Sequence, residues 1–245
     1  MEYIVETKSL TKKYKNNTAI NHVDIQLKKG SIYGLVGRNG AGKTTLMKLI
    51  SDLINSTDGE IIYYTNGIET KQMDFLKRVG TLIEAPGLYP FMNAFDNIKS
   101  ILLCGKGSYT KEKIDELIEL VGLTPHKEKK VKAYSLGMKQ RLGIAVALAN
   151  DPELLLLDEP INGLDPQGIK HVRSMLKEIN ESYGTTIVVS SHLLDELSKI
   201  ATDYCIIDNG KVVLQATKEE LEELSGEKSL EEYYFDLVGG DRYDG

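Results

Sequence analysis

The stretch that most constrains the fold of this chain is Gly37-Arg38-Asn39-Gly40-Ala41-Gly42-Lys43-Thr44, which follows the pattern G-x-x-x-x-G-K-T of phosphate-binding loops. An apolar run over residues 31–36 precedes the stretch and suits a buried strand. After the stretch, apolar residues recur at the spacing of one helix face: Leu46, Leu49, Ile50, Leu53 and Ile54. A strand, a glycine-rich turn and a helix in this order are the context that the motif requires.

Each residue type in this stretch has a physical reason to bind phosphate. Glycines let the backbone close around an anion without clashes of Cβ atoms, and a helix start directs unpaired N–H groups at it. The charge of Lys43 suits the β- and γ-phosphates, and the Thr44 hydroxyl suits Mg²⁺. We therefore predict that the chain binds a nucleoside triphosphate with Mg²⁺. The predicted phosphate-contacting residues are Gly37, Arg38, Asn39, Gly40, Ala41, Gly42, Lys43, Thr44 and Thr45.

The composition is that of a water-soluble globular protein of 245 residues, with 41% hydrophobic and 27% charged residues. No apolar run approaches the ~20 residues of a membrane span, and the amino terminus does not have the features of a signal peptide. The two cysteines, Cys104 and Cys205, lie in unrelated apolar stretches, as expected for small buried side chains in a reducing cytosol. We expect a cytoplasmic protein.

The net charge of −6 is unevenly distributed along the chain. Residues 218–245 carry ten acidic and three basic side chains, whereas the preceding residues carry 26 acidic and 27 basic ones. Nothing in these preceding residues resembles a basic face for nucleic acid, so we expect no nucleic-acid partner. The simplest interpretation of the acidic end is a solvated surface helix followed by an end segment.

Periodicity outlines the rest of the fold. Residues 3–8, 20–27 and 59–64 alternate as half-buried strands do, and a polar turn is predicted over 10–17. A helical lobe is predicted over about 86–150. The fold class is therefore α/β, with a P-loop NTPase core of mainly parallel strands, an antiparallel β subdomain and an inserted helical lobe. We place the main domain at 1–217 and a C-terminal helix and tail at 218–245.

Three further motifs stand in a fixed order after the phosphate loop. Tyr134-Ser135-Leu136-Gly137-Met138-Lys139-Gln140-Arg141 precedes a helix, Asp158-Glu159 ends an all-apolar strand, and Ser190-Ser191-His192 ends another. This order resembles the ATP-binding cassette (ABC) family of ATPases from Tyr14 to His192, with a matching hairpin to about residue 215. A P-loop GTPase is disfavoured because no Asn-Lys-x-Asp motif is present.

The resemblance implies a role for several residues. It gives Tyr14 the stacking contact with the adenine of ATP, although an ordinary turn tyrosine remains an alternative. It implies that Asp158 holds Mg²⁺, that Glu159 polarises the attacking water and that His192 contacts the γ-phosphate. Lys43 would act with them in catalysis. The stretch Asn162-Gly163-Leu164-Asp165 resembles the loop that crosses a dimer interface.

Two positions depart from the family pattern. The usual Leu-Ser-Gly-Gly-Gln reads here Tyr134-Ser135-Leu136-Gly137-Met138, so Ser135 and Gly137 remain to bind the ATP of a second, head-to-tail subunit, most simply an identical one. Glu84 stands where the family commonly has glutamine. We expect Glu84 to approach the Mg²⁺, although an exposed acid at a strand end is the alternative.

The motifs are most similar to exporters associated with bacitracin resistance and lantibiotic immunity. That resemblance implies a separate integral membrane permease, docked on the apolar loop 88–92, with this chain at the inner face of the cell membrane. The same loop could instead be core of the lobe. The rival hypothesis is a soluble ABC ATPase that acts as a regulatory or assembly factor without a permease.

Overall fold

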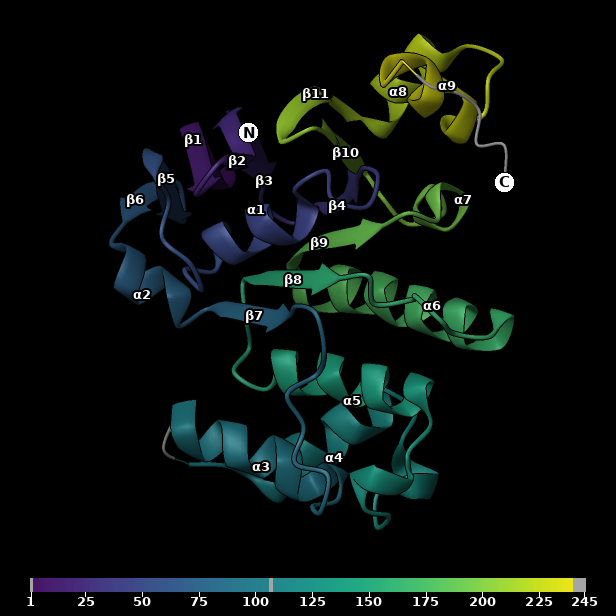
Figure 1. Ribbon diagram of the computed structural model, residues 1–245. Coiled ribbons are helices and arrows are strands. Elements are labelled where there is room, and N and C mark those ends of the chain that lie inside the picture. The colour runs from purple at the N-terminus through teal and green to yellow at the C-terminus, as the bar shows by residue number, and fades with distance from the viewer. Residues whose placement is uncertain (1, 106–107, 240–245) are drawn as a thin grey trace.

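A six-stranded sheet forms the centre of the molecule (Figure 1). The computed structural model describes residues 2–105 and 108–239. The strand order is β11-β10-β4-β9-β8-β7, and the strands from β10 to β7 are parallel, whereas β11 pairs antiparallel with β10 after the turn at Asn209-Gly210. The strands are β4 (Ile32–Val36), β7 (Val79–Leu82), β8 (Leu154–Asp158), β9 (Thr186–Ser191), β10 (Asp203–Asp208) and β11 (Lys211–Thr217). The predicted mainly parallel sheet is confirmed.

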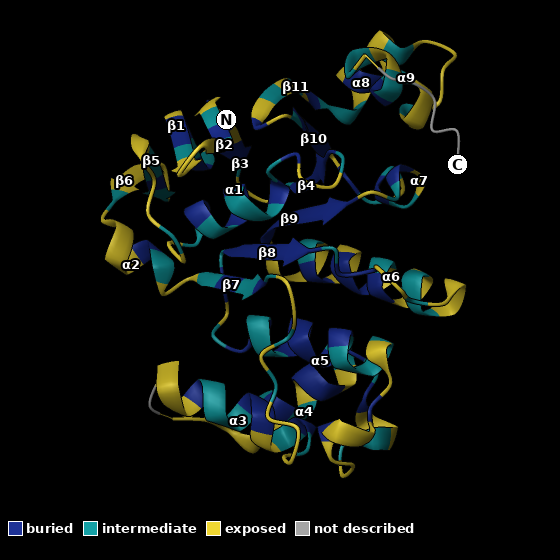
Figure 2. Cartoon of the chain, viewed as in Figure 1, coloured by how far each residue is buried: buried dark blue, intermediate teal, exposed yellow. Residues whose placement is uncertain are grey.

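Strand β8 is apolar on both sides because both faces of this sheet are covered. Leu155 and Leu157 belong to the core formed with helices on one face, and Leu154 and Leu156 belong to the core on the other face. All five residues of β8 are buried (Figure 2). Such a strand can present polar groups only at its end, which is where Asp158 stands.

A second sheet, whose strand pairs are antiparallel, packs against helix α1 (Lys43–Ile50) as part of the core that contains Leu154 and Leu156. Its strands are β1 (Tyr3–Tyr14), β2 (Asn17–Val23), β3 (Gln26–Lys28), β5 (Asp58–Thr65) and β6 (Ile68–Thr70). The polar turn predicted over 10–17 was too long, because β1 continues to Tyr14 and turns only at residues 15–16. Irregular pairing with β2 breaks the alternation that would have shown it.

Helices cover the sheets and form a separate layer below β7 and β8 in Figure 1. That layer contains α3, α4 and α5, whose buried sides face one another (Figure 2). We propose that it is the inserted lobe. The helices are α2 (Gln72–Leu76), α3 (Ala94–Gly105), α4 (Lys111–Leu120), α5 (Leu136–Leu148), α6 (Pro166–Tyr183), α7 (Leu194–Leu197), α8 (Lys218–Ser225) and α9 (Leu230–Leu237), with 3-10 turns at Thr124–His126 and Val131–Ala133.

The acidic C-terminal segment is more than a solvated helix. Thr217 and Ser229 each cap a short helix, α8 and α9, in a reciprocal arrangement with a glutamate three residues later. Leu221 and Tyr234 are buried in the main core. The structure therefore has two surface helices where we expected one, each anchored by a single buried side chain, and residues 240–245 of the predicted tail lie outside the described residues.

Candidate nucleotide site

The phosphate loop closes tightly around its own lysine. Lys43 Nζ donates to the carbonyl oxygens of Gly37 at 2.6 Å and Arg38 at 3.2 Å. A Cβ atom at Gly37 would lie 2.4 Å from the Ile207 carbonyl oxygen, and Gly42 adopts a φ of 114°. Burial lowers the pKa of Lys43, while the nearby Glu159 and Asp158 raise it. The glycines are therefore required by space and conformation, and the charge of Lys43 is held inside the loop.

Asp158 is held by hydroxyl groups on both sides. Thr44 Oγ1 donates to Asp158 Oδ2 at 2.7 Å, and Ser190 Oγ donates to Asp158 Oδ1 at 2.6 Å. The Ser190 hydroxyl also accepts from the Glu159 backbone N–H at 2.8 Å. Ser190 therefore holds the carboxylate of Asp158 and the backbone of Glu159, a role that the motif Ser-Ser-His did not reveal in the sequence.

Glu159 lies between the side chains of Lys43 and His192. One carboxylate oxygen is 3.8 Å from Lys43 Nζ, and the other is 2.9 Å from His192 Nδ1. The Glu159 backbone has a φ of 49°, in the left-handed region that non-glycine residues rarely adopt. Strain of this kind is typical of functional positions. The structure thus brings together three residues that the sequence placed in one catalytic group.

A cavity of about 520 Å³ opens beside these groups. Most of the predicted nucleotide-binding residues line it. One further turn, at Asn209 and Gly210, also lines it, although the sequence analysis assigned these two residues only to a hairpin. Tyr14 lies at its rim, 46% exposed, with Lys12 Nζ 5.1 Å from its ring centroid. The lining residues are Tyr14, Asn17, Thr18, Ala19, Asn39, Gly40, Gly42, Lys43, Thr44, Thr45, Asp158, Glu159, Asn209 and Gly210.

Arg38 and His192 instead line a smaller hollow of about 230 Å³ on the other side of the loop. Glu231, Tyr234 and Phe235 of α9 form its far wall. The Nε and Nη2 atoms of Arg38 are buried and have no hydrogen-bond partner among the described residues. The C-terminal helix therefore lies directly against the phosphate loop.

The other predicted residues lie away from the cavity. Ser135 caps α5 and accepts from the Met138 N–H, and Asp165 caps α6 and accepts from the Gly168 N–H. A Cβ atom at Gly137 would lie 3.4 Å from Leu164, so these two cap regions are neighbours.

Glu84, the second departure from the expected pattern, is not among the described residues that line the 520 Å³ cavity. Its carboxylate pairs with Lys48 of α1 at 2.5 Å. Its side chain is largely exposed, so the contact with Mg²⁺ that we expected from the sequence stays a prediction.

Comparison with known proteins decides the family. The model of the ABC transporter family matches residues 20–162. This chain is an ABC transporter family member. The bacitracin transport ATP-binding protein BcrA of Enterococcus faecalis is 44% identical over 221 residues, which are 90% of this chain and 71% of that protein. The lantibiotic transport ATP-binding protein SrtF of Streptococcus pyogenes is 40% identical over 232 residues, covering 94% of this chain and 96% of that protein.

Solved ABC structures share the fold of this cassette. The dimeric ATP-binding cassette MJ0796, in a post-hydrolysis state bound to ADP and phosphate, aligns with a TM-score of 0.77 at 26% identity over 88% of this chain and 99% of that chain. An ATP-binding subunit of an ABC transporter aligns with a TM-score of 0.82 at 25% identity over 96% of this chain and 99% of that chain. The predicted ABC ATPase fold is confirmed, and the cassette is an ABC ATP-binding subunit.

The donor groups of the cassette fit a magnesium ion that is shared with a nucleotide. Among residues 2–105 and 108–239, no three His, Cys, Asp or Glu side chains gather closely enough to hold a metal ion on their own. Mg²⁺ is usually held by one or two carboxylates together with phosphates and water. The hydroxyl of Thr44 and the carboxylate of Asp158, already in contact, are oxygen ligands of this kind.

Proposed function

We propose that the cassette hydrolyses Mg²⁺-ATP and thereby drives a separate membrane permease, in an exporter of peptide antibiotics or related toxic compounds. The observation that carries the hydrolytic part is the placement of Lys43 and His192 on either side of Glu159, beside a cavity that adjoins the phosphate loop. Phosphoryl transfer to water needs positioning and charge stabilisation, and these groups supply both.

In this proposal each side chain has a defined task. Glu159 accepts a hydrogen bond from the attacking water and polarises it, and His192 keeps the Glu159 carboxylate oriented and contacts the γ-phosphate. Lys43 and the amides of residues 39–44 neutralise charge that develops on the phosphate. Thr44 and Asp158 would hold Mg²⁺, which when bound supplies further compensation of phosphate charge. Tyr14 at the cavity rim stacks on adenine.

A second cassette completes the site in our proposal. Ser135, Gly137 and the start of α5 offer hydrogen-bond donors for the γ-phosphate of an ATP held by another subunit. They lie beside the loop 162–165, which the family resemblance assigns to the dimer interface. The solved cassette MJ0796, which is similar to this chain, is dimeric. We therefore propose a head-to-tail dimer of identical chains.

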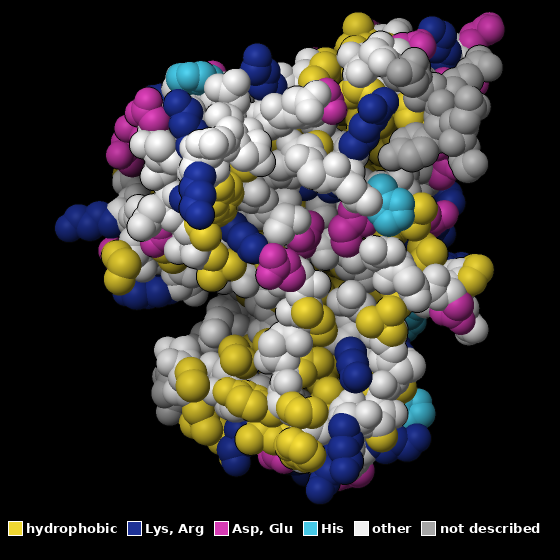
Figure 3. All heavy atoms as spheres, viewed as in Figure 1, with side chains coloured by type: hydrophobic (Ala, Val, Ile, Leu, Met, Phe, Trp, Pro, Cys, Tyr) yellow, Lys and Arg dark blue, Asp and Glu magenta, His cyan; other side chains and the backbone are white. Residues whose placement is uncertain are grey.

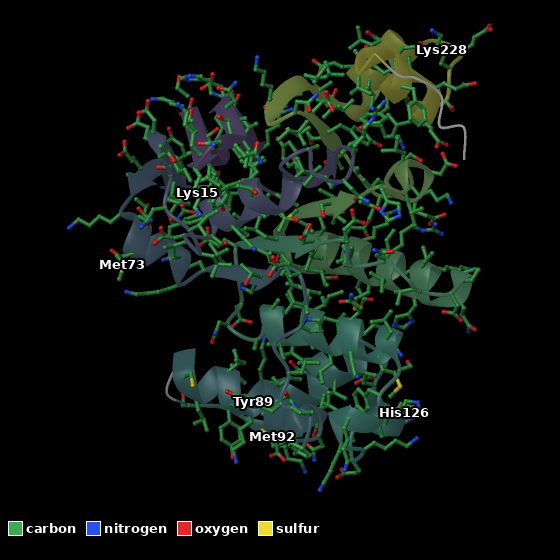
Figure 4. All side chains as sticks on the ribbon, viewed as in Figure 1. Lys15, Met73, Tyr89, Met92, His126 and Lys228 are labelled. Carbon is green, nitrogen blue, oxygen red and sulfur yellow. The ribbon has the colours of Figure 1, made fainter. Side chains whose placement is uncertain are left out.

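The permease contact is proposed at an exposed apolar surface of the lobe (Figure 3). None of the helices within the described residues is long and apolar enough to cross a membrane. Hydrophobic side chains gather on the lobe, and Figure 4 shows Tyr89 and Met92 there. An exposed apolar patch of this kind is typical of a protein interface. We call the exposed side chains of the loop 88–92, Tyr89, Phe91 and Met92, the lobe patch.

The export of peptide antibiotics is proposed from the relatives, which are named for bacitracin and lantibiotic transport. In that role the cassette would lie at the inner face of the cell membrane, bound to its permease.

Copurification from detergent-solubilised cells tests the permease. We expect a stoichiometric partner with several apolar spans of ~20 residues each. Phe91→Asp, which places a charge at the most exposed residue of the lobe patch, should abolish its recovery and leave ATP hydrolysis by the isolated cassette unchanged. Met73→Asp is the matched control, because Met73 is equally exposed but lies on α2, outside the lobe (Figure 4). Recovery of a water-soluble partner alone would contradict the proposal and favour an assembly or regulatory factor.

A further inference from the structure

Helix α1 contacts two neighbouring strand ends at once. Thr44 binds Asp158, which ends β8, and one helical turn later Lys48 binds Glu84, two residues past the end of β7. Residues four apart lie on the same face of a helix. Strands β7 and β8 are parallel neighbours, with Leu82 opposite Leu157. The pair Lys48–Glu84 therefore lies beside the proposed metal-binding pair Thr44–Asp158.

The Lys48–Glu84 pair is well placed to exchange partners. The Glu84 side chain is 67% exposed and that of Lys48 is 25% exposed. An ion pair as open to water as this one contributes little to stability. Its two partners can therefore separate at small cost when a stronger charge approaches either of them.

Glu84 also stands at a sharp turn of the backbone. Its φ is 65°, and the Ala85 N–H donates back to the Ile83 carbonyl at 2.9 Å. The chain then enters the loop that carries Tyr89, whose N–H donates to Asn97 Oδ1 of α3 at 2.7 Å. A movement of Glu84 would thus displace the segment that leads into the lobe patch.

We propose that Lys48 is a positioning residue that competes with bound Mg²⁺-nucleotide for the carboxylate of Glu84. In the observed pair Lys48 neutralises Glu84 and holds this third carboxylate on α1, apart from Asp158 and Glu159. A divalent ion at Thr44 and Asp158 attracts Glu84 more strongly than one lysine does, so binding transfers the carboxylate from α1 to the ion. This inference rests on the proposed function, because it needs Mg²⁺-nucleotide at that site.

Mg²⁺ titration of nucleotide binding tests the competition without any turnover. The probe is a fluorescent, non-hydrolysable ATP analogue, followed by polarisation at increasing Mg²⁺. Lys48→Gln should lower the Mg²⁺ concentration at half-maximal binding by about two- to fivefold, because the weak ion pair no longer competes and Glu84 is released to the ion. Glu84→Gln should raise it, and Lys48→Gln should have no further effect in the Glu84→Gln protein.

A matched control removes one positive charge elsewhere. Lys177→Gln breaks the exposed pair with Glu181 on α6 and should leave the Mg²⁺ dependence unchanged. The inference is overturned if Lys48→Gln acts like Lys177→Gln, or if it acts equally with and without Glu84. Failure of the native chain to bind the analogue at any Mg²⁺ concentration would instead refute the proposed function. Urea unfolding of each variant confirms that the fold is retained.

Discussion

At the scale of single residues, Glu159 is the side chain on which the proposed hydrolysis depends most. Its two oxygens face Lys43 and His192, so replacement by glutamine keeps its size and removes its charge. We expect Glu159→Gln to bind ATP and to hydrolyse it about 10²–10⁴-fold more slowly, the range for loss of a general base. Phosphate release and equilibrium binding measure the two effects separately. Turnover at the native rate would refute the role of Glu159.

Ser190 is expected to matter through the groups that it holds. Its hydroxyl binds Asp158 Oδ1 and the Glu159 N–H, and all of these groups are wholly or largely enclosed. Ser190→Ala should lower the free energy of unfolding by about 1.5–3 kcal/mol, because a hydrogen bond to a buried charged group is lost. It should also lower the ATP turnover rate.

Ser191→Ala is the control for Ser190→Ala. Ser191 is also buried, but its hydroxyl accepts from the Leu193 N–H, and among the described residues it makes no hydrogen bond to Asp158 or Glu159. It should therefore affect stability with a smaller effect on turnover. Equal turnover in the two variants would remove Ser190 from the positioning of the site.

Site residues could be predicted from the sequence when they belong to a local motif. Lys43 and Thr44 belong to such a motif, and Asp158-Glu159 ends a strand whose burial on both faces explains its leucines. Ser190, Asn209 and Gly210 could not be assigned in this way. Their contacts depend on which strands are neighbours in the sheet. The pattern of residues along the sequence does not reveal that strand order.

At the scale of secondary-structure elements, those with a regular pattern of buried residues could be predicted from the sequence, and those with an irregular pattern could not. Strand β8 was readable because every residue is buried. Strand β1 was predicted only over residues 3–8. Its second half was missed, because irregular pairing with β2 shifts its side chains between faces and buries Thr11 in the interior. Helices α8 and α9 were assigned to solvent because their charges outnumber the few apolar residues that anchor them.

Helix α9 is expected to stabilise the core through one of those anchors. Tyr234 is 5% exposed and lines the hollow next to Arg38 and His192. Tyr234→Ala should lower the free energy of unfolding by about 3–5 kcal/mol, as truncation of a buried aromatic side chain does. Leu224→Ala, on the exposed side of α8, should change it by less than about 0.5 kcal/mol. Equal urea midpoints for the two variants would show that α9 does not contribute to the core.

At the scale of the whole molecule, the two proposed partners meet different surfaces. In the proposed assembly the lobe patch would face a permease, whereas the start of α5 and the neighbouring loop 162–165 would face a second cassette. Strand β7 pairs with β8, whose last residue, Asp158, binds Thr44 of the phosphate loop. Residues 83–93 then join β7 to α3 of the lobe, so this stretch would connect the two surfaces.

The head-to-tail dimer can be tested on the isolated cassette. In the Glu159→Gln protein, ATP should persist and double the molecular mass measured by light scattering. Leu136 is half exposed at the start of α5, where the γ-phosphate of the partner's ATP is expected to lie. Leu136→Glu, added to Glu159→Gln, places a carboxylate against that phosphate and should prevent the increase in mass. Leu103→Glu adds the same charge to an exposed leucine of α3 and should leave the dimer intact. A dimer that tolerates Leu136→Glu as well as Leu103→Glu would assemble through another surface, and the phosphate-binding role proposed for Ser135 and Gly137 would then be wrong.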